Sequence, residues 1–233
     1  SLHQGFLKAA ADIVQRLAEE CGRPAGEAWT AEIVANHELF GWWLGNIDDL
    51  LTATPIALNP INYPGKRGHV RLDPLGVLGL ITPWNLPVAI PLRTIIPAIL
   101  SGNGVLWKPS EHAPQISALL SQLFDAHLEP NLVTCIQGDG QQGAAIAHAG
   151  VNAVFFTGSV RTGRTVQRMA AEAGVPATLE LGGKDAAVVL ADANIERAAK
   201  GITWAAFGFA GQNCAAVERC YVHRDVYAPF LEA

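Results

Sequence analysis

The sequence has few charged residues and no run of lysine or arginine. Of 233 residues, 16% are charged, and the formal net charge is -5. A nucleic-acid surface normally shows a basic patch or stripe, so the sequence argues against a nucleic-acid partner. The acidic residues are scattered too, and the charge pattern therefore identifies no other partner.

Cysteines are also few, and none is paired in the C-x-x-C spacing of a zinc site. The four residues are Cys21, Cys135, Cys214 and Cys220. This density is far below that of a disulfide scaffold. We therefore expect no metal site and a reducing compartment, with the cytoplasm as the simplest location.

The chain shows neither a signal-peptide layout nor an uninterrupted apolar span. The most apolar stretch, residues 75–100, is broken by several residues that a membrane helix rarely carries, namely Pro83, Asn85, Pro87, Pro91 and Arg93. Hydrophobic residues make up 50% of the chain. That is enough for a sizeable core, in one large domain or two small ones, and we expect no membrane association.

The middle of the chain alternates between short apolar runs and helical patterns. The runs predict strands over 105–107, 132–136 and 154–156, and the patterns predict helices over 115–127, 144–149 and 163–173. Such alternation predicts an α/β fold with a doubly wound parallel sheet, which binds ligands at the carboxyl ends of its strands.

The flanking segments follow other patterns. Residues 1–52 read as two helices separated by Cys21-Gly22-Arg23-Pro24. Residues 56–73 are punctuated by proline and glycine, which favours an exposed hairpin or an inter-subunit strand. Two strand-like runs, 178–181 and 186–190, precede a helix that begins near Asn194.

Two glycine-containing turns compete as the phosphate site of a nucleotide. Gly138–Gly143 fits G-x-G-x-x-G, but the acidic residue expected about 20 positions later is missing, which favours a plain tight turn. At Gly158-Ser159 a strand runs into a helix whose first N–H groups, with the Ser159 hydroxyl, can hold a pyrophosphate oxygen. Ser159 can equally serve as a helix cap, and the two roles are compatible.

Further polar residues stand where strands or turns end. Lys108 and Glu111 follow a strand, where they can hydrogen-bond ribose hydroxyls, although an isolated lysine there is usually just solvated. Cys214 follows Gly-Gln in a turn-like setting that suits a reactive thiol better than a buried one. Glu180 precedes a glycine pair and is a candidate base, the alternative being a solvated strand residue.

Taken together, the chain resembles the NAD(P)-dependent aldehyde dehydrogenase superfamily along its whole length. The resemblance rests on five segments in the family's order: Thr82-Pro83-Trp84-Asn85, Lys108-Pro109-Ser110-Glu111, Phe156-Thr157-Gly158-Ser159, Glu180-Leu181-Gly182-Gly183-Lys184 and Gly211-Gln212-Asn213-Cys214. It implies a Rossmann-like cofactor domain and the start of a second α/β catalytic domain.

The resemblance also implies roles for individual residues. Cys214 matches the catalytic nucleophile, Glu180 the general base, and Asn85 the side-chain amide of the oxyanion hole. The expected cofactor is NAD, with NADP as the alternative. The positions expected to bind it are Ile81, Thr82, Pro83, Trp84, Lys108, Ser110, Glu111, Gly140, Gly158, Ser159, Leu181 and Gly182. Within the family the pyrophosphate turn is the Gly158-Ser159 one.

The implied reaction oxidises an aldehyde to a carboxylic acid through a thiohemiacetal and a thioester on the cysteine. Arg93 lies eight residues after Asn85, on a segment that the family makes a helix lining the substrate tunnel. Two helical turns would place both residues on one face, so that Arg93 could contact an anionic semialdehyde. Arginine at this position also occurs in family members that act on aromatic aldehydes.

The family pattern predicts three regions. These are an NAD(P)-binding domain over 1–55 and 75–181, an oligomerisation segment over 56–74, and a partial catalytic domain over 182–233. We expect a fragment that lacks the family's N-terminal start and most of the C-terminal half of its catalytic domain, and a homodimer or homotetramer at full length.

Two alternatives come from other classes. A catalytically incomplete or silent nucleotide-binding module would keep the Gly158-Ser159 turn, yet Asn85, Glu180 and Cys214 are all present. A cysteine hydrolase would need a histidine partner, and none of the seven histidines lies in a recognisable local signature.

Overall fold

The computed structural model describes residues 1–233 and divides the chain into two compact units. The first unit contains residues 1–157 and 164–179. The second contains residues 158–163 and 180–233.

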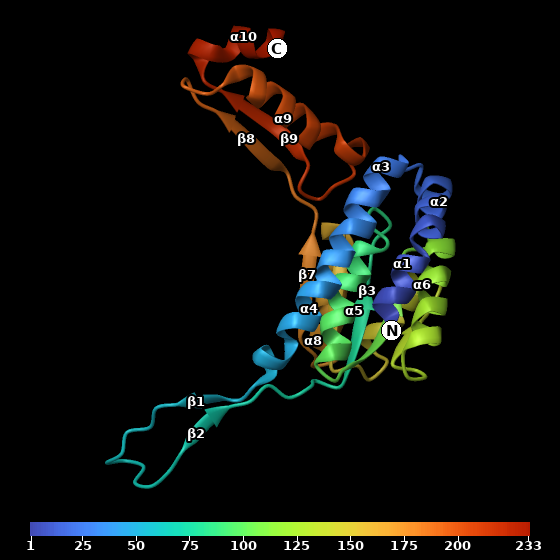
Figure 1. The fold of residues 1–233 in the computed structure, drawn as a ribbon, viewed down its shortest axis with the longest axis vertical. Helices are drawn as coiled ribbons and strands as arrows, with labels where there is room; N and C mark the ends of the chain where they lie inside the picture. Colours follow the sequence, from blue (N-terminus) through green and yellow to red (C-terminus); the bar gives the residue numbers. More distant parts are fainter. The chain divides into compact units, whose positions relative to one another are not determined.

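A five-stranded parallel sheet forms the centre of the first unit (Figure 1). In sequence order the strands are β3 (Val77–Ile81), β4 (Gly104–Lys108), β5 (Val133–Cys135), β6 (Ala153–Gly158) and β7 (Ala177–Leu181). Their order in the sheet is β5-β4-β3-β6-β7. The chain therefore builds outward from β3 in one direction, returns, and continues on its other side. This confirms the predicted doubly wound sheet and places its switch point between β3 and β6.

Helices connect successive strands and cover both faces of the sheet. They are α5 (Ala89–Leu100), α6 (Pro114–His127), α7 (Gly140–Ala147) and α8 (Val160–Glu172). Alternation along β3 separates the two faces. Leu78 and Leu80 belong to the core that includes Leu92 of α5. On the opposite face, a Cβ added at Gly79 would lie 2.4 Å from Ile146 of α7, so glycine permits this close approach.

The N-terminal segment packs as a helical layer against α5 and α6. It consists of α1 (Leu2–Lys8), α2 (Ala10–Cys21), α3 (Ala25–Ala28), the π-helical segment η1 (Trp29–Val34) and α4 (Ala35–Leu51). The apolar side chains of Leu2, Phe6, Ile13 and Leu17 are buried in this layer. The break falls at Gly22 as predicted, but each of the two predicted helices is subdivided.

A separate hairpin follows α4 (Figure 1). Its strands β1 (Thr54–Ile56) and β2 (Gly68–Val70) pair antiparallel with each other and with no other strand. Ile61, in the connecting loop, is 86% exposed. The exposed hairpin predicted from the proline and glycine pattern is therefore present.

The second unit is built around a parallel strand pair, β8 (Asp185–Val189) and β9 (Val217–Val222). The connection between them contains α9 (Ile195–Phe207), whose first turn is capped by the Asn194 side chain, and the 3₁₀ turn η2 (Gly208–Gly211). The short helices η3 (Arg224–Val226) and α10 (Tyr227–Glu232) end the chain. No helix in either unit is both long and apolar enough to cross a membrane.

Candidate active site

The carboxyl ends of β3 and β4 form a polar corner of the first unit. The Thr82 N–H donates to the Lys108 carbonyl oxygen at 3.1 Å, which extends the β3–β4 ladder by one bond. The buried Trp107 indole donates to the Thr82 hydroxyl at 2.9 Å. Thr82 is thus fixed at the sheet edge where a doubly wound fold binds its ligand. Pro83 and Trp84 continue from it, and Trp84 is 38% exposed.

Lys108 is a buried cation at the same edge. Its Nζ lies 3.2 Å from Glu111 Oε2, and the Glu111 side chain is exposed. The pKa of Glu111 is lowered, first because its own backbone N–H donates to the carboxylate and further because Lys108 faces it. Ser110 is buried, and its hydroxyl accepts from the His112 N–H at 3.3 Å. The corner therefore presents one ammonium and one carboxylate in a fixed arrangement.

The turn at Gly138–Gly143 is the capped start of α7. The Asp139 side chain accepts from the Gln141 N–H at 2.8 Å, and the Asp139 N–H donates to Gln142 Oε1 at 2.9 Å. This capping box begins the helix at Gly140, four residues before the predicted start. It also places a carboxylate against the first-turn N–H groups, which disfavours a phosphate at this turn. Gly140 itself is exposed, and a Cβ added there would meet only open space.

Asn85 and Arg93 do not share a helix, so the spacing used to place them on one face was wrong. Asn85 lies in a bend, and α5 begins only at Ala89. The Ile90 N–H makes an early i-to-i−4 bond of this segment, to the Leu86 carbonyl. Pro87 follows Leu86 directly, and a residue before proline is kept out of the helical region of backbone conformation. Asn85 is half-buried.

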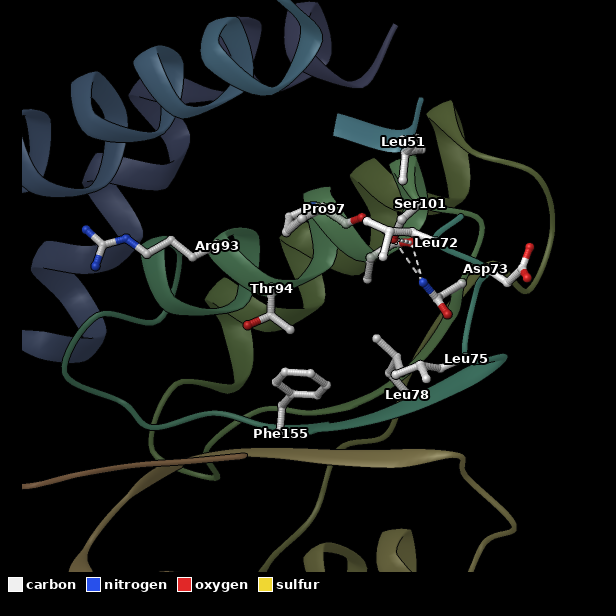
Figure 2. A pocket seen from close by; sticks show the side chains of 12 residues that line it. Leu51, Leu72, Asp73, Leu75, Leu78, Arg93, Thr94, Pro97, Ser101 and Phe155 are labelled. Carbon is white, nitrogen blue, oxygen red and sulfur yellow. Dashed lines mark hydrogen bonds between the residues drawn. The ribbon is translucent and has the colours of Figure 1, made fainter. Parts of the chain in front are cut away.

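Arg93 is exposed on α5, at one end of a pocket of about 380 Å³ in the first unit (Figure 2). Leu75, Leu78 and Phe155 line the interior of this pocket. The Arg93 guanidinium points away from those apolar side chains. The pocket and the charged end of Arg93 are therefore separate features.

In the second unit, Ser159 caps the start of α8. Its hydroxyl accepts from the Thr162 N–H at 3.2 Å, and its carbonyl accepts from the Gly163 N–H at 2.8 Å. Ser159 is exposed and Gly158 is half-buried. The capping interpretation of Ser159 is confirmed, and it leaves the compatible anion-binding role as a prediction.

Cys214 and the glutamate segment approach each other within the second unit. A Cβ added at Gly183 would lie 3.0 Å from the Cys214 carbonyl oxygen, so the glycine allows the backbones to pack closely. Glu180, Gly182 and Cys214 are exposed, and Leu181 is half-buried. The Arg219 guanidinium donates to the Lys184 carbonyl and ties this segment to β9. The Cys214 turn therefore packs against Gly183, three residues after Glu180 at the end of β7.

The turn that carries Cys214 contains features that the sequence did not indicate. Asn213 Oδ1 accepts from the Ala215 N–H at 3.1 Å and from the Cys214 thiol at 3.6 Å. Just before it, Phe209 and Ala210 adopt left-handed φ angles of 55° and 54°. Such conformations are costly for residues other than glycine and are often found at functional sites. The strained turn and the Asn213 side chain together fix the backbone around the thiol.

The other titratable groups form no comparable centre. No group of three or more His, Cys, Asp and Glu side chains is arranged to hold a metal. All four cysteines are free. Burial raises the pKa of Cys135 to about 11, and Cys21 is likewise raised in pKa by burial.

The doubly wound sheet defines a Rossmann-like α/β protein, and its second unit carries an exposed thiol in a strained turn. A model of the aldehyde dehydrogenase family matches residues 2–233. The chain belongs to this family.

Its relatives are longer than the chain. It is 36% identical over 229 residues to a 4,4'-diapolycopene aldehyde oxidase of Methylomonas sp, covering 96% of this chain and 43% of the relative. It is 36% identical over 242 residues to a 2-hydroxymuconic semialdehyde dehydrogenase of Pseudomonas sp. (strain CF600), covering 99% and 49%. The crystal structure of PnpE in complex with nicotinamide adenine dinucleotide matches with a TM-score of 0.92 and 30% identity, covering 99% and 47%. The chain therefore spans a little under half the length of these relatives.

Proposed function

We propose that the protein oxidises an aldehyde to a carboxylic acid with NAD(P) as the hydride acceptor. The observation that carries this proposal is the exposed Cys214 thiol in its strained turn, whose backbone packs closely against Gly183. Family membership and the names of the aldehyde and semialdehyde relatives support it.

Each step of the proposed reaction has a residue in this chain. The Cys214 thiolate attacks the aldehyde carbon, and the Asn85 amide and the Cys214 N–H stabilise the resulting oxyanion. A bound nicotinamide would supply the acceptor for the hydride that leaves this carbon, and Cys214 would then hold the acyl group as a thioester. Glu180 takes a proton from water, which attacks the thioester, releases the acid and restores the thiolate.

We propose a cofactor-binding role for each of the residues that the family resemblance indicates. The predicted set is Ile81, Thr82, Pro83, Trp84, Lys108, Ser110, Glu111 and Gly140 in the first unit and Gly158, Ser159, Leu181 and Gly182 in the second. The buried Lys108 and the ionised Glu111 suit ribose hydroxyls, and a carboxylate there disfavours a 2′-phosphate. Glu111→Gln is expected to lower the preference for NAD over NADP, measured as the ratio of kcat/KM values. An unchanged ratio contradicts the assignment.

The substrate class is proposed more narrowly as a semialdehyde or an aromatic aldehyde. Arg93 is exposed and its guanidinium is directed away from the neighbouring apolar pocket, which leaves it accessible to a carboxylate. Arg93→Ala should lower kcat/KM for succinate semialdehyde and leave that for benzaldehyde unchanged. Equal losses for both substrates contradict an anionic contact.

The activity is tested in the intact gene product by aldehyde-dependent NADH absorbance. Cys214→Ala should abolish the signal. Cys220→Ala, which changes an exposed cysteine on β9, should retain it. A silent nucleotide-binding module would give no signal in the wild type. Ester cleavage without NAD or aldehyde oxidation would instead identify a hydrolase.

The regional organisation is proposed in the same way. Residues 1–55 and 75–181 would form the NAD(P)-binding domain and residues 182–233 part of the catalytic domain. Residues 56–74, which include most of the exposed hairpin, would mediate assembly into a homodimer or homotetramer at full length. Light scattering of the intact gene product tests the assembly, and a monomer contradicts it. A cytoplasmic location stays a prediction.

A further inference from the structure

A buried ion pair connects the N-terminal helical layer to the loop that carries Asn85. Arg23 follows the end of α2, and Glu32 lies in the π-helical segment η1. Their side chains are 4% and 0% exposed, and Arg23 Nη1 lies 2.9 Å from Glu32 Oε1. A pair of this kind is costly to bury unless its remaining donors and acceptors are satisfied.

The remaining atoms of the pair bind the Asn85 loop at its middle and at its end. Arg23 Nη2 donates to the Asn85 carbonyl oxygen. Glu32 Oε2 accepts from the Ala89 N–H at 2.6 Å, and the Val88 N–H also donates to this carboxylate. The loop between β3 and α5 is therefore held at the Asn85 carbonyl and at the start of α5.

The local backbone explains why an external clamp is needed. Asn85 lies outside both β3 and α5, and Pro87 has no N–H to donate. The first N–H groups of a helix lack partners within the helix, and here Glu32 supplies them. On the other side, the Asn36 side chain donates to the Glu32 carbonyl at 2.7 Å and steadies the π-helical turn.

We propose that Arg23 and Glu32 are positioning residues that fix the Asn85 backbone so that its side-chain amide meets the developing oxyanion. The inference rests on the proposed role of Asn85. A carbonyl bond at Asn85 and N–H bonds at Val88 and Ala89 tie the loop to one buried ion pair, so the Asn85 backbone and the start of α5 are held together. Misplacement of a catalytic group by about 1 Å can cost on the order of 100-fold in rate.

A double-mutant cycle in the intact gene product tests this inference. Arg23→Lys keeps the positive charge beside Glu32, but a single ammonium replaces the two nitrogens that contact Glu32 and Asn85. We expect kcat/KM for the aldehyde to fall about 10- to 100-fold, with KM for NAD unchanged. Asn85→Ala should lower it about 100- to 1000-fold. The double variant should match Asn85→Ala alone, because Arg23 acts through Asn85.

A second variant separates positioning from folding. Replacing a buried ion pair by apolar residues of similar size often preserves stability, so Arg23→Met/Glu32→Met should stay folded and still lose the clamp. Faster hydrogen exchange at the Val88 and Ala89 amides would show the loss directly. Lys200→Gln, in the exposed Glu196–Lys200 pair of α9, is the matched control and should leave both readouts unchanged.

The possible results are distinguishable. The inference is overturned if the losses in kcat/KM from Arg23→Lys and Asn85→Ala multiply in the double variant. It is also overturned if the Arg23→Met/Glu32→Met variant folds and keeps wild-type activity and wild-type hydrogen exchange. A wild-type protein without aldehyde-dependent NADH formation refutes the proposed function instead. In that case the exchange at Val88 and Ala89 still decides whether the pair holds the loop.

Discussion

At the scale of single residues, the proposed nucleophile Cys214 and the proposed base Glu180 have different local environments. Cys214 lies in a turn fixed by Asn213 and preceded by two left-handed residues, whereas Glu180 is exposed at the end of β7. This division fits two separate duties, with Cys214 in acylation and Glu180 in deacylation. It does not require a base that activates the thiol directly.

The substitution Glu180→Gln tests this division of roles. The variant should retain a burst of NADH close to one equivalent per site, because the thiol and the hydride step are intact. Its steady-state rate should fall about 100- to 10,000-fold, because water is no longer deprotonated. Stopped-flow absorbance measures both phases. Loss of the burst together with the steady state would assign Glu180 to acylation instead.

The sequence indicates candidate residues where the signal is local, and it misses residues whose partners lie far away in the sequence. Cys214, Glu180 and Lys108 stand in short segments whose glycines and strand ends are visible locally. Arg23 and Glu32 gave no such signal, because their bonds to Asn85 and Ala89 join segments about sixty residues apart. Asn213 was missed for another reason, since its role depends on a turn geometry that no pattern of residue types specifies.

At the scale of secondary-structure elements, alternation and capping residues predicted most of the sheet and helices. Asn194 begins α9 as expected, but α7 begins earlier than predicted because Asp139 and Gln142 form a capping box. The assumed helix from Asn85 to Arg93 failed at Pro87. The π-helical turn η1 could not be predicted, because it depends on burying Glu32 against another element.

The burial of Glu32 has a pH-dependent consequence for stability. Burial raises the pKa of Glu32 from 4.5 to about 7, although Arg23 and the Ala89 and Val88 N–H groups act to lower it. The folded state therefore holds this proton more tightly than the unfolded state. The resulting stabilisation is complete below about pH 4.5 and is lost as the pH rises to about 7.

The variant Glu32→Gln should remove this dependence. Relative to the variant, the unfolding free energy of the wild type should fall by up to about 3 kcal/mol between pH 4.5 and 7. Urea denaturation of both proteins at several pH values measures the difference. Glu196→Gln, in an exposed i,i+4 pair with Lys200, is the control and should show little change. A pH-independent difference for Glu32→Gln contradicts the assignment.

The contact between the glutamate and cysteine segments makes a prediction at Gly183. In Gly183→Ala the new methyl group would press on the Cys214 carbonyl oxygen and on Asp185. We expect a loss of about 1–3 kcal/mol in unfolding free energy. Gly201→Ala, within α9 and with open space around it, should instead gain up to about 1 kcal/mol. Equal effects in denaturant titrations would show that the two loops are not in close contact.

At the scale of the whole molecule, the chain combines a doubly wound sheet, an exposed hairpin and a smaller unit that carries the thiol. Four strands of the sheet were predictable from their own apolar runs, but the central strand β3 and the helix α5 were not among the elements predicted from the pattern. The division into two units was harder to predict from the sequence, because residues 158–163 group with the second unit although they continue from β6.

The central claim is that Cys214 carries the acyl intermediate of aldehyde oxidation. The most direct measurement is peptide mass spectrometry of the Glu180→Gln variant of the intact gene product after brief incubation with NAD and an aldehyde substrate. We predict that the peptide containing Cys214 gains the mass of the acyl group, only when NAD is present, while Cys21, Cys135 and Cys220 stay unmodified. An acyl group on another cysteine, or none on Cys214 while NADH is formed, would contradict the claim.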